Sequence, residues 1–163
     1  MFTLIVDNVR SMHNVGSFFR TADAMGFSSI HLCGITPTPM GRLGAPRTQI
    51  QKVALGAETH VPWKQWGGTA QCLTALKKEG WYLLACEQGT SSKNLSSFMP
   101  PRASRVALVV GNELSGLKEE IISLCDDVVQ IPMKGSKESL NVSVAFGIIA
   151  WELVTRLKKQ TKS

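Results

Sequence analysis

The chain has 163 residues, 44% of them hydrophobic, and this size and composition predict one folded domain with no room for a second. Lysine and arginine outnumber aspartate and glutamate by 18 to 12, and the net charge of +6 favours a polyanionic partner without separating RNA from DNA. No stretch reaches the roughly 20 apolar residues of a membrane-spanning helix, and the N-terminus lacks the basic segment of a secretory signal. We therefore expect a soluble, cytoplasmic protein.

Short apolar runs alternate with helical patterns along the chain. The expected strands are 2–6, 29–32, 60–63 at an edge, 81–86, 106–110 and 128–132. The expected helices are 14–25, 48–56, 69–79, 118–125 and a long final helix from 140 to about 159. Strands that are apolar almost throughout and alternate with helices predict a largely parallel α/β sheet with helices on both faces.

One polar turn precedes the final helix, within the segment IPMKGSKESLNVSVA at 131–145. Ser139 and Asn141 are good helix-capping residues, and the free N–H groups of a helix start can also bind an anion. A simple cap is the commoner use of such residues. The helix that follows is apolar on most sides, so it must be buried in the core or against a second subunit.

A second polar turn, GNELSG at 111–116, follows a buried strand. Gly111 permits a close backbone approach or a positive φ, at the strand end where open α/β sheets bind ligands. Gly111 and Gly116 have the glycine spacing of a phosphate loop, but the lysine is displaced to Lys118 and no Ser or Thr follows it, so an NTPase fits poorly. Asn112 and Glu113 could equally form only a polar turn.

The first expected helix carries the polar residues Asn14 and Arg20 beside apolar neighbours, within NVRSMHNVGSFFRTADAMGF. Arg20 could be a surface charge, as most arginines are, or a clamp for phosphate and ribose. The three histidines and four cysteines show no spacing typical of metal ligands, so we expect no metal and free thiols in a reducing compartment.

In order and content the three segments 8–20, 109–117 and 131–145 resemble the three motifs of the SPOUT-class RNA ribose 2′-O-methyltransferases of the SpoU/TrmH type. The resemblance spans about residues 3–157 and implies a C-terminal trefoil knot and S-adenosylmethionine as cofactor. It assigns catalytic roles to Asn14, Arg20, Glu113, Ser139 and Asn141. It assigns cofactor binding to Glu87, Gly111, Asn112, Ile131, Met133, Ser139 and Leu140.

By the same resemblance, Asn14 positions Arg20, and Arg20 activates the ribose 2′-hydroxyl. A guanidinium group stays protonated at ordinary pH, so two roles are open. Arg20 could act as a strongly perturbed base. It could instead bind the adjacent phosphate and stabilise the developing alkoxide while the proton leaves to a phosphate oxygen or to water.

The expected partner is RNA, with tRNA preferred and ribosomal RNA second; a non-catalytic RNA-binding member of the same fold is the alternative. The candidate phosphate contacts are Arg10, Arg42, Arg47, Lys52, Lys134, Lys137, Arg156, Lys158, Lys159 and Lys162. We expect one catalytic domain over residues 1–163 without an RNA-binding extension. We also expect a homodimer through the final helix, with Ile149 and Trp151 in the interface.

Overall fold

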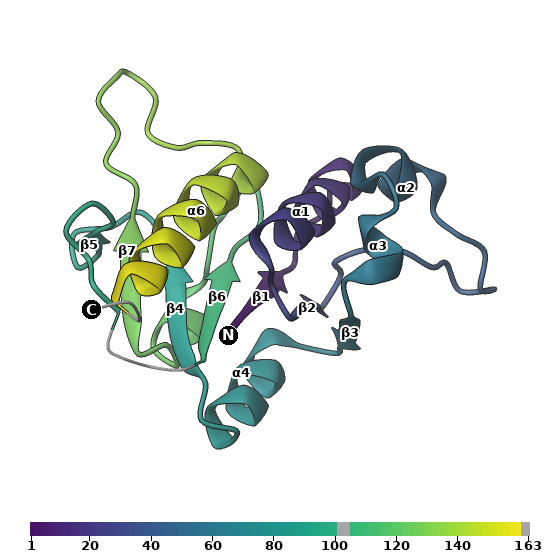
Figure 1. Cartoon of the computed structure of the whole chain (residues 1–163), viewed down its shortest axis with the longest axis horizontal. Helices are drawn as coiled ribbons and strands as arrows, with labels where there is room; N and C mark the ends of the chain where they lie inside the picture. The colour runs from purple at the N-terminus through teal and green to yellow at the C-terminus, as the bar shows by residue number, and fades with distance from the viewer. Residues whose placement is uncertain (101–104, 161–163) are drawn as a thin grey trace.

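A seven-stranded sheet, in which every neighbouring pair of strands runs parallel, forms the centre of the protein (Figure 1). The computed structural model describes residues 1–100 and 105–160, and side chains as far as residue 157. In this part of the chain the strand order is β3-β2-β1-β6-β4-β7-β5. The strands are β1 (Phe2–Asp7), β2 (Ser29–Cys33), β3 (Trp63–Trp66), β4 (Tyr82–Cys86), β5 (Lys93–Asn94), β6 (Val106–Val110) and β7 (Asp127–Gln130).

Helices cover both faces of this sheet, as the sequence predicted. They are α1 (Met12–Met25), α2 (Thr48–Ala54), α3 (Ala57–His60), α4 (Thr69–Lys78), α5 (Glu119–Ile122) and α6 (Val142–Gln160). Successive side chains of a strand point to opposite faces. Leu108 of β6 therefore packs in the core cluster that contains residues of α1 and α6, whereas its neighbour Val109 packs with residues of α4 and α5.

Three local expectations were wrong. The edge strand β3 begins at Trp63, and the preceding residues form the short helix α3, because the chain joins the sheet only where the Pro62 carbonyl accepts from the Ile30 N–H. The helix expected at 118–125 is the single turn α5, since Asp126 already bonds to Leu83 and leads into β7. Strand β5 was missed because it consists of two polar residues.

The helices α1 and α6 lie side by side on one face of the sheet (Figure 1). The rings of Phe18 and Phe146 meet edge to face, with centroids 5.7 Å apart. Ser11 caps α1 by accepting from the Asn14 N–H, and Asn141 caps α6 by accepting from the Ser143 N–H at 2.9 Å. Helix α6 thus starts after Asn141, and the cap predicted there is confirmed for Asn141.

Candidate functional site

A cavity of about 630 Å³ opens at the edge of the sheet where the carboxyl ends of β4, β6 and β7 meet. Because parallel strands end at the same edge, segments far apart in sequence converge there. All seven residues that the resemblance assigns to the cofactor line this cavity, as do Glu113 and Asn141. The remaining described lining residues are Cys86, Gln88, Leu114, Ser115, Gly116, Val129, Gln130, Glu138, Val142, Ala145 and Ile149.

Gly111 lies under a loop that folds back onto the end of β6. The Gly116 N–H donates to the Asn112 carbonyl at 3.1 Å, which brings Gly116 and Leu117 against Gly111. A Cβ at position 111 would lie 2.5 Å from the Leu117 nitrogen and 2.7 Å from the Gly116 oxygen. The glycine is needed for this close approach and not for a positive φ, which is found instead at Gly116.

Glu87 holds the same loop from the end of β4. Its carboxylate accepts from the Leu117 N–H at 2.6 Å and packs against Gly116, where a Cβ would lie 2.8 Å from the carboxyl carbon. Next to it, Gln88 donates from Nε2 to the Ile131 carbonyl at 2.9 Å. The sequence reasoning missed Gln88, although its position just after a buried strand was a usable signal.

Asn112 forms the polar turn that was one of its two possible roles. Its Oδ1 accepts from the N–H groups of Leu114 and Ser115, both at 2.9 Å, in an Asx-type turn. Leu114 is exposed at the tip of this turn. Asn112 therefore shapes the loop, and Glu113 is left free to point away from it.

Glu113 reaches the start of α1 and bonds to the first motif. Its carboxylate accepts from the Arg10 N–H at 3.2 Å, the Ser11 N–H at 3.1 Å and Nδ2 of Asn14 at 3.0 Å. Burial alone would raise the pKa of Glu113. The hydrogen bonds from its own backbone N–H, Asn14, Ser11 and Arg10 outweigh that effect and hold its pKa below the usual value.

Asn14 also bonds to the third motif, because its Oδ1 accepts from Nδ2 of Asn141 at 3.1 Å. Asn14 is buried, so both of its polar groups are satisfied inside the protein. The three residues form one chain of hydrogen bonds at the cavity mouth. Ser139 is exposed and lines the cavity beside them.

Arg20 does not join this group within the single chain. It lies on α1, is exposed, and falls outside the set of described residues that line the cavity. Its neighbours Phe18 and Phe19 are fully buried, as the apolar pattern predicted.

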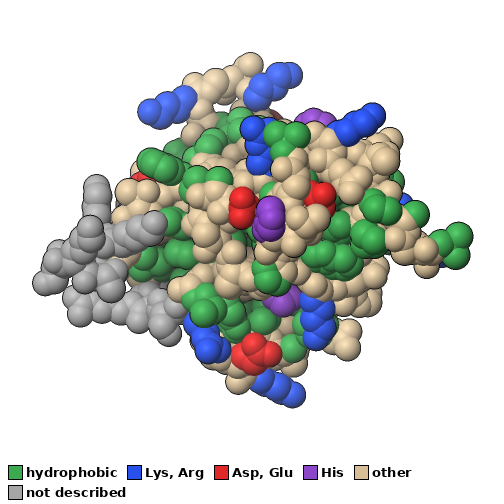
Figure 2. Space-filling view, turned by 45° about the vertical axis from the view of Figure 1, so that its right-hand side comes forward, with side chains coloured by type: hydrophobic (Ala, Val, Ile, Leu, Met, Phe, Trp, Pro, Cys, Tyr) green, Lys and Arg blue, Asp and Glu red, His purple; other side chains and the backbone are tan. Residues whose placement is uncertain are grey.

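The predicted RNA contacts Arg10, Arg42, Lys134 and Lys137 are all exposed, and Arg47 is half-buried. Figure 2 shows Lys and Arg side chains distributed around the margin of one face and not gathered into one block.

Arg42 lies at the tip of a hairpin turn. The turn is closed by a hydrogen bond of 3.0 Å that the Gly44 N–H donates to the Gly41 carbonyl. Lys52 is also exposed. The side chains of Lys158 and Lys159, and all of Lys162, lie outside the described residues.

Among the residues described, no group of three or more His, Cys, Asp or Glu side chains could hold a metal ion. None of the helices in that part of the chain is long and apolar enough to cross a membrane.

The sequence model of the SpoU rRNA Methylase family matches residues 1–151. The chain is 34% identical over 154 residues to the 23S rRNA (guanosine-2′-O-)-methyltransferase RlmB of Escherichia coli K12, covering 94% of this chain and 59% of RlmB. It spans 57 to 59% of the length of the curated relatives that it matches.

Solved structures that share the fold include the following two. An AdoMet-bound rRNA methyltransferase of Sinorhizobium meliloti has a TM-score of 0.83 and 28% identity, covering 95% of this chain and 56% of that one. A structure reported for 2-OH methylation of C/U34 on tRNA has a TM-score of 0.81 and 26% identity, covering 98% of this chain and 97% of that one. With the match over residues 1–151 and the three motifs meeting at one cavity, this chain belongs to the SpoU rRNA Methylase family.

Proposed function

We propose that this protein is an S-adenosylmethionine-dependent RNA methyltransferase that modifies a ribose 2′-hydroxyl of tRNA. The observation that carries the proposal is the cavity where segments 86–88, 111–116 and 129–142 meet, with Glu113 and Asn141 in its lining and both bonded to Asn14. Its volume lies within the range of about 300–1,000 Å³ that is usual for small-molecule sites.

The residues of the cavity suit a cofactor that is part nucleoside and part amino acid. Backbone groups around Ile131, Met133 and Leu140, which line the cavity, would hold the adenine end, as the family resemblance implies, and the close approach at Gly111 shapes another part of the lining. The bound cofactor supplies a methyl group on a positively charged sulfur, which is already an activated electrophile. The protein therefore has mainly to position the hydroxyl and manage charge.

Arg20 acts on the RNA side. Its guanidinium binds the phosphate beside the target ribose and stabilises the negative charge that develops on the 2′-oxygen as its proton leaves, before the methyl transfer neutralises that charge. The hydroxyl proton leaves to a phosphate oxygen or to water. Asn14, held by Glu113 and Asn141, fixes the start of the helix that presents Arg20.

The choice of tRNA is supported by the structure reported for C/U34 methylation on tRNA, which this chain matches over nearly the whole length of both. The second candidate is ribosomal RNA, which the name of RlmB favours. A non-catalytic binding role is less well supported, since Asn14, Glu113 and Asn141 are assembled into one bonded cluster.

We further propose a homodimer built on α6, whose outer side carries Val144, Ile148 and Trp151 with exposures of 50%, 41% and 61%. These residues are spaced four and three apart and so form one stripe. The dimer completes each site with the neighbouring subunit and doubles the basic surface offered to RNA. The C-terminal segment forms the trefoil knot of the family.

The test is mass-spectrometric mapping of 2′-O-methyl nucleotides in RNA from cells with and without the gene, followed by methylation of transcribed tRNA and 23S rRNA by the purified protein. We expect one tRNA site to lose its methyl group in the deletion strain and to regain it in vitro. A loss confined to 23S rRNA would establish the second candidate. An unchanged pattern in both RNAs would support the non-catalytic role.

A further inference from the structure

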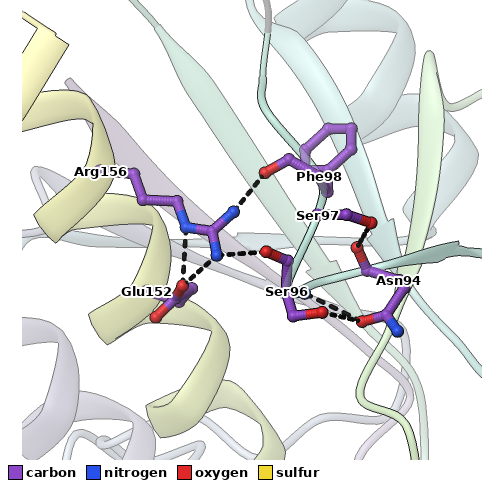
Figure 3. A network of polar contacts seen from close by, with 6 residues as sticks. All are labelled: Asn94, Ser96, Ser97, Phe98, Glu152 and Arg156. Atoms are coloured by element: carbon purple, nitrogen blue, oxygen red, sulfur yellow. Dashed lines mark hydrogen bonds and ion pairs between the residues drawn. The ribbon is translucent and has the colours of Figure 1, made fainter.

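Arg156, near the end of α6, reaches from the helix to the neighbouring segment at residues 96–98 (Figure 3). Nη1 donates to the Phe98 carbonyl at 2.9 Å and Nη2 to the Ser96 carbonyl at 2.6 Å. Nε donates to Glu152, one turn earlier, at 2.6 Å. The planar fork of a guanidinium is suited to holding two carbonyls and a carboxylate at once. The side chain that the sequence marked as a phosphate contact is thus engaged within the protein.

Further hydrogen bonds connect the segment that Arg156 holds to the cavity. The Leu95 N–H donates to the Gln130 carbonyl at 2.9 Å, and Gln130 donates from Nε2 to the Ser92 carbonyl at 3.3 Å. Ser92 in turn donates from Oγ to the Glu87 carbonyl at 2.9 Å. Glu87 and Gln88 line the cavity, and Glu87 holds Leu117. Residues 87–98 therefore form one bonded segment, the 87–98 wall, which borders the cavity at Glu87 and Gln88 and ends at Arg156.

The other wall belongs to the helix that carries Arg156. Val142, Ala145 and Ile149 of α6 line the same cavity. Ile149 precedes Arg156 by seven residues, or about 10 Å along the helix axis. Arg156 therefore fastens the 87–98 wall to the helical wall through hydrogen bonds, beside the apolar packing of Leu95 and Phe98.

We propose that Arg156 is a positioning residue for the cofactor cavity, which sets the separation of these two walls and does not contact RNA. The inference rests on the proposed function, because it takes the cavity to be the cofactor site. Leu95 and Phe98 are each only 5% exposed and β5 pairs with β7, so the segment stays packed when the guanidinium is removed. Loss of Arg156 loosens the wall without unfolding the protein.

The test replaces Arg156 by Met, which keeps a long apolar stem and removes the three hydrogen bonds and the ion pair with Glu152. We expect the dissociation constant for S-adenosylhomocysteine, measured by calorimetry, to rise about tenfold, or about 1.4 kcal/mol, which is close to the loss of one charge-assisted hydrogen bond. The KM for the cofactor should rise with kcat little changed, whereas a smaller folded fraction would lower kcat alone. RNA affinity without cofactor should stay within about twofold of the parent. Arg156→Lys should restore part of the affinity, since an ammonium can hold one carbonyl.

The matched control is Arg105→Met. Arg105 also donates to a backbone carbonyl, that of Glu79 at 3.1 Å, and its loss removes the same charge away from the 87–98 wall. Unchanged cofactor affinity in Arg156→Met, or weakened RNA binding in its place, would overturn the inference. If that variant does not fold, Glu152→Gln tests the same clamp through a smaller loss of affinity, and no loss there would be equally decisive. Failure of the parent protein to bind S-adenosylhomocysteine would instead refute the proposed function.

Discussion

The side chain of Asn141 donates a hydrogen bond of 3.1 Å to the side chain of Asn14, although the two residues are 127 positions apart. The same Asn14 donates to Glu113, which joins the loop after β6 to the group. Asn141 also caps α6 through its Oδ1. One buried amide therefore fixes the starts of two helices and the acidic loop in a single geometry.

Asn14→Asp should uncouple this geometry. An aspartate has nearly the same shape but cannot donate to Glu113, and it places a second negative charge beside that carboxylate. We expect the free energy of unfolding to fall by about 1–3 kcal/mol and the methylation rate to fall at least tenfold. Chemical denaturation and single-turnover methylation measure the two effects.

Asn94→Asp is the control, because the Asn94 side chain only accepts, from Ser96, and an aspartate preserves that role while adding the same charge. Equal effects of the two substitutions would contradict the proposed coupling.

Gly111→Ala should weaken cofactor binding strongly, although alanine adds only a methyl group. The new Cβ would press on the backbone at Gly116 and Leu117, which cannot move without releasing the Glu87 contact. Calorimetric titration with S-adenosylhomocysteine should show this loss for Gly111→Ala and none for Gly67→Ala, since a Cβ at 67 meets nothing within 4 Å. Equal affinity in the two variants would remove Gly111 from the cofactor site.

The overall architecture could be predicted because a strand buried on both faces has a distinctive sequence. Val106–Val110 is apolar at every position, and such runs alternating with helices leave little choice beyond a parallel sheet. Lys93–Asn94 carries no such signal. Strand β5 forms because β7 offers it hydrogen-bonding groups, which is a tertiary cause invisible in the local sequence.

The site could be predicted only as a set of segments. The resemblance placed Gly111 and Ile131 in one cofactor site, and the meeting of the carboxyl ends of parallel strands at one edge is the physical reason why the two segments converge. The Asn14–Asn141 bond depends on how α1 and α6 pack, and no local pattern specifies that packing.

The apolar pattern of α6 likewise did not distinguish the side chains that are buried in the core from those that are exposed on the surface. Ile149 was expected in a dimer interface, and this was wrong, because it is 2% exposed within the single chain. Trp151 is 61% exposed and stays a candidate for the interface.

Arg20→Ala should lower the single-turnover methylation rate by about 10²–10⁴, the usual effect of losing a positioned electrostatic or acid–base group. Cofactor affinity should be unchanged, because Arg20 is outside the described cavity lining. Arg20→Lys should not restore the rate, since an ammonium lacks the planar fork. Arg105→Ala serves as the charge-matched control, and a near-normal rate for Arg20→Ala would exclude Arg20 from the active site.

The free energy of unfolding should fall as the pH falls below about 6.5, and His31 is the cause. Burial, and then the charge of Lys64, lower the pKa of His31 from 6.5 to about 4. The unfolded chain binds more protons between these values, so the stabilisation is complete above pH 6.5 and is lost as the pH falls towards 4. The full loss amounts to roughly 3 kcal/mol.

Chemical denaturation between pH 6.5 and 5 isolates the effect of His31. The pKa values of Glu113 and Asp127 are lowered, so the stabilisation that these two carboxylates provide is lost only at lower pH. His31→Gln should flatten the slope, and the exposed His60→Gln should not. The same slope in all three proteins would exclude His31 as its source.

Trp151→Asp should give monomers that have lost activity. Trp151 lies with Val144 and Ile148 on the outer stripe of α6, so a charge there disrupts burial against a second subunit without touching the core. The thermal unfolding temperature of the ligand-free Trp151→Asp monomer should be little changed. Ile149→Asp should instead unfold the chain, because that side chain is buried. Leu43→Asp is the control, since Leu43 is 98% exposed and lies far from α6 in sequence, and it should stay dimeric. Sedimentation that finds the parent protein monomeric at micromolar concentration and fully active would rule out the dimer as a requirement for methylation.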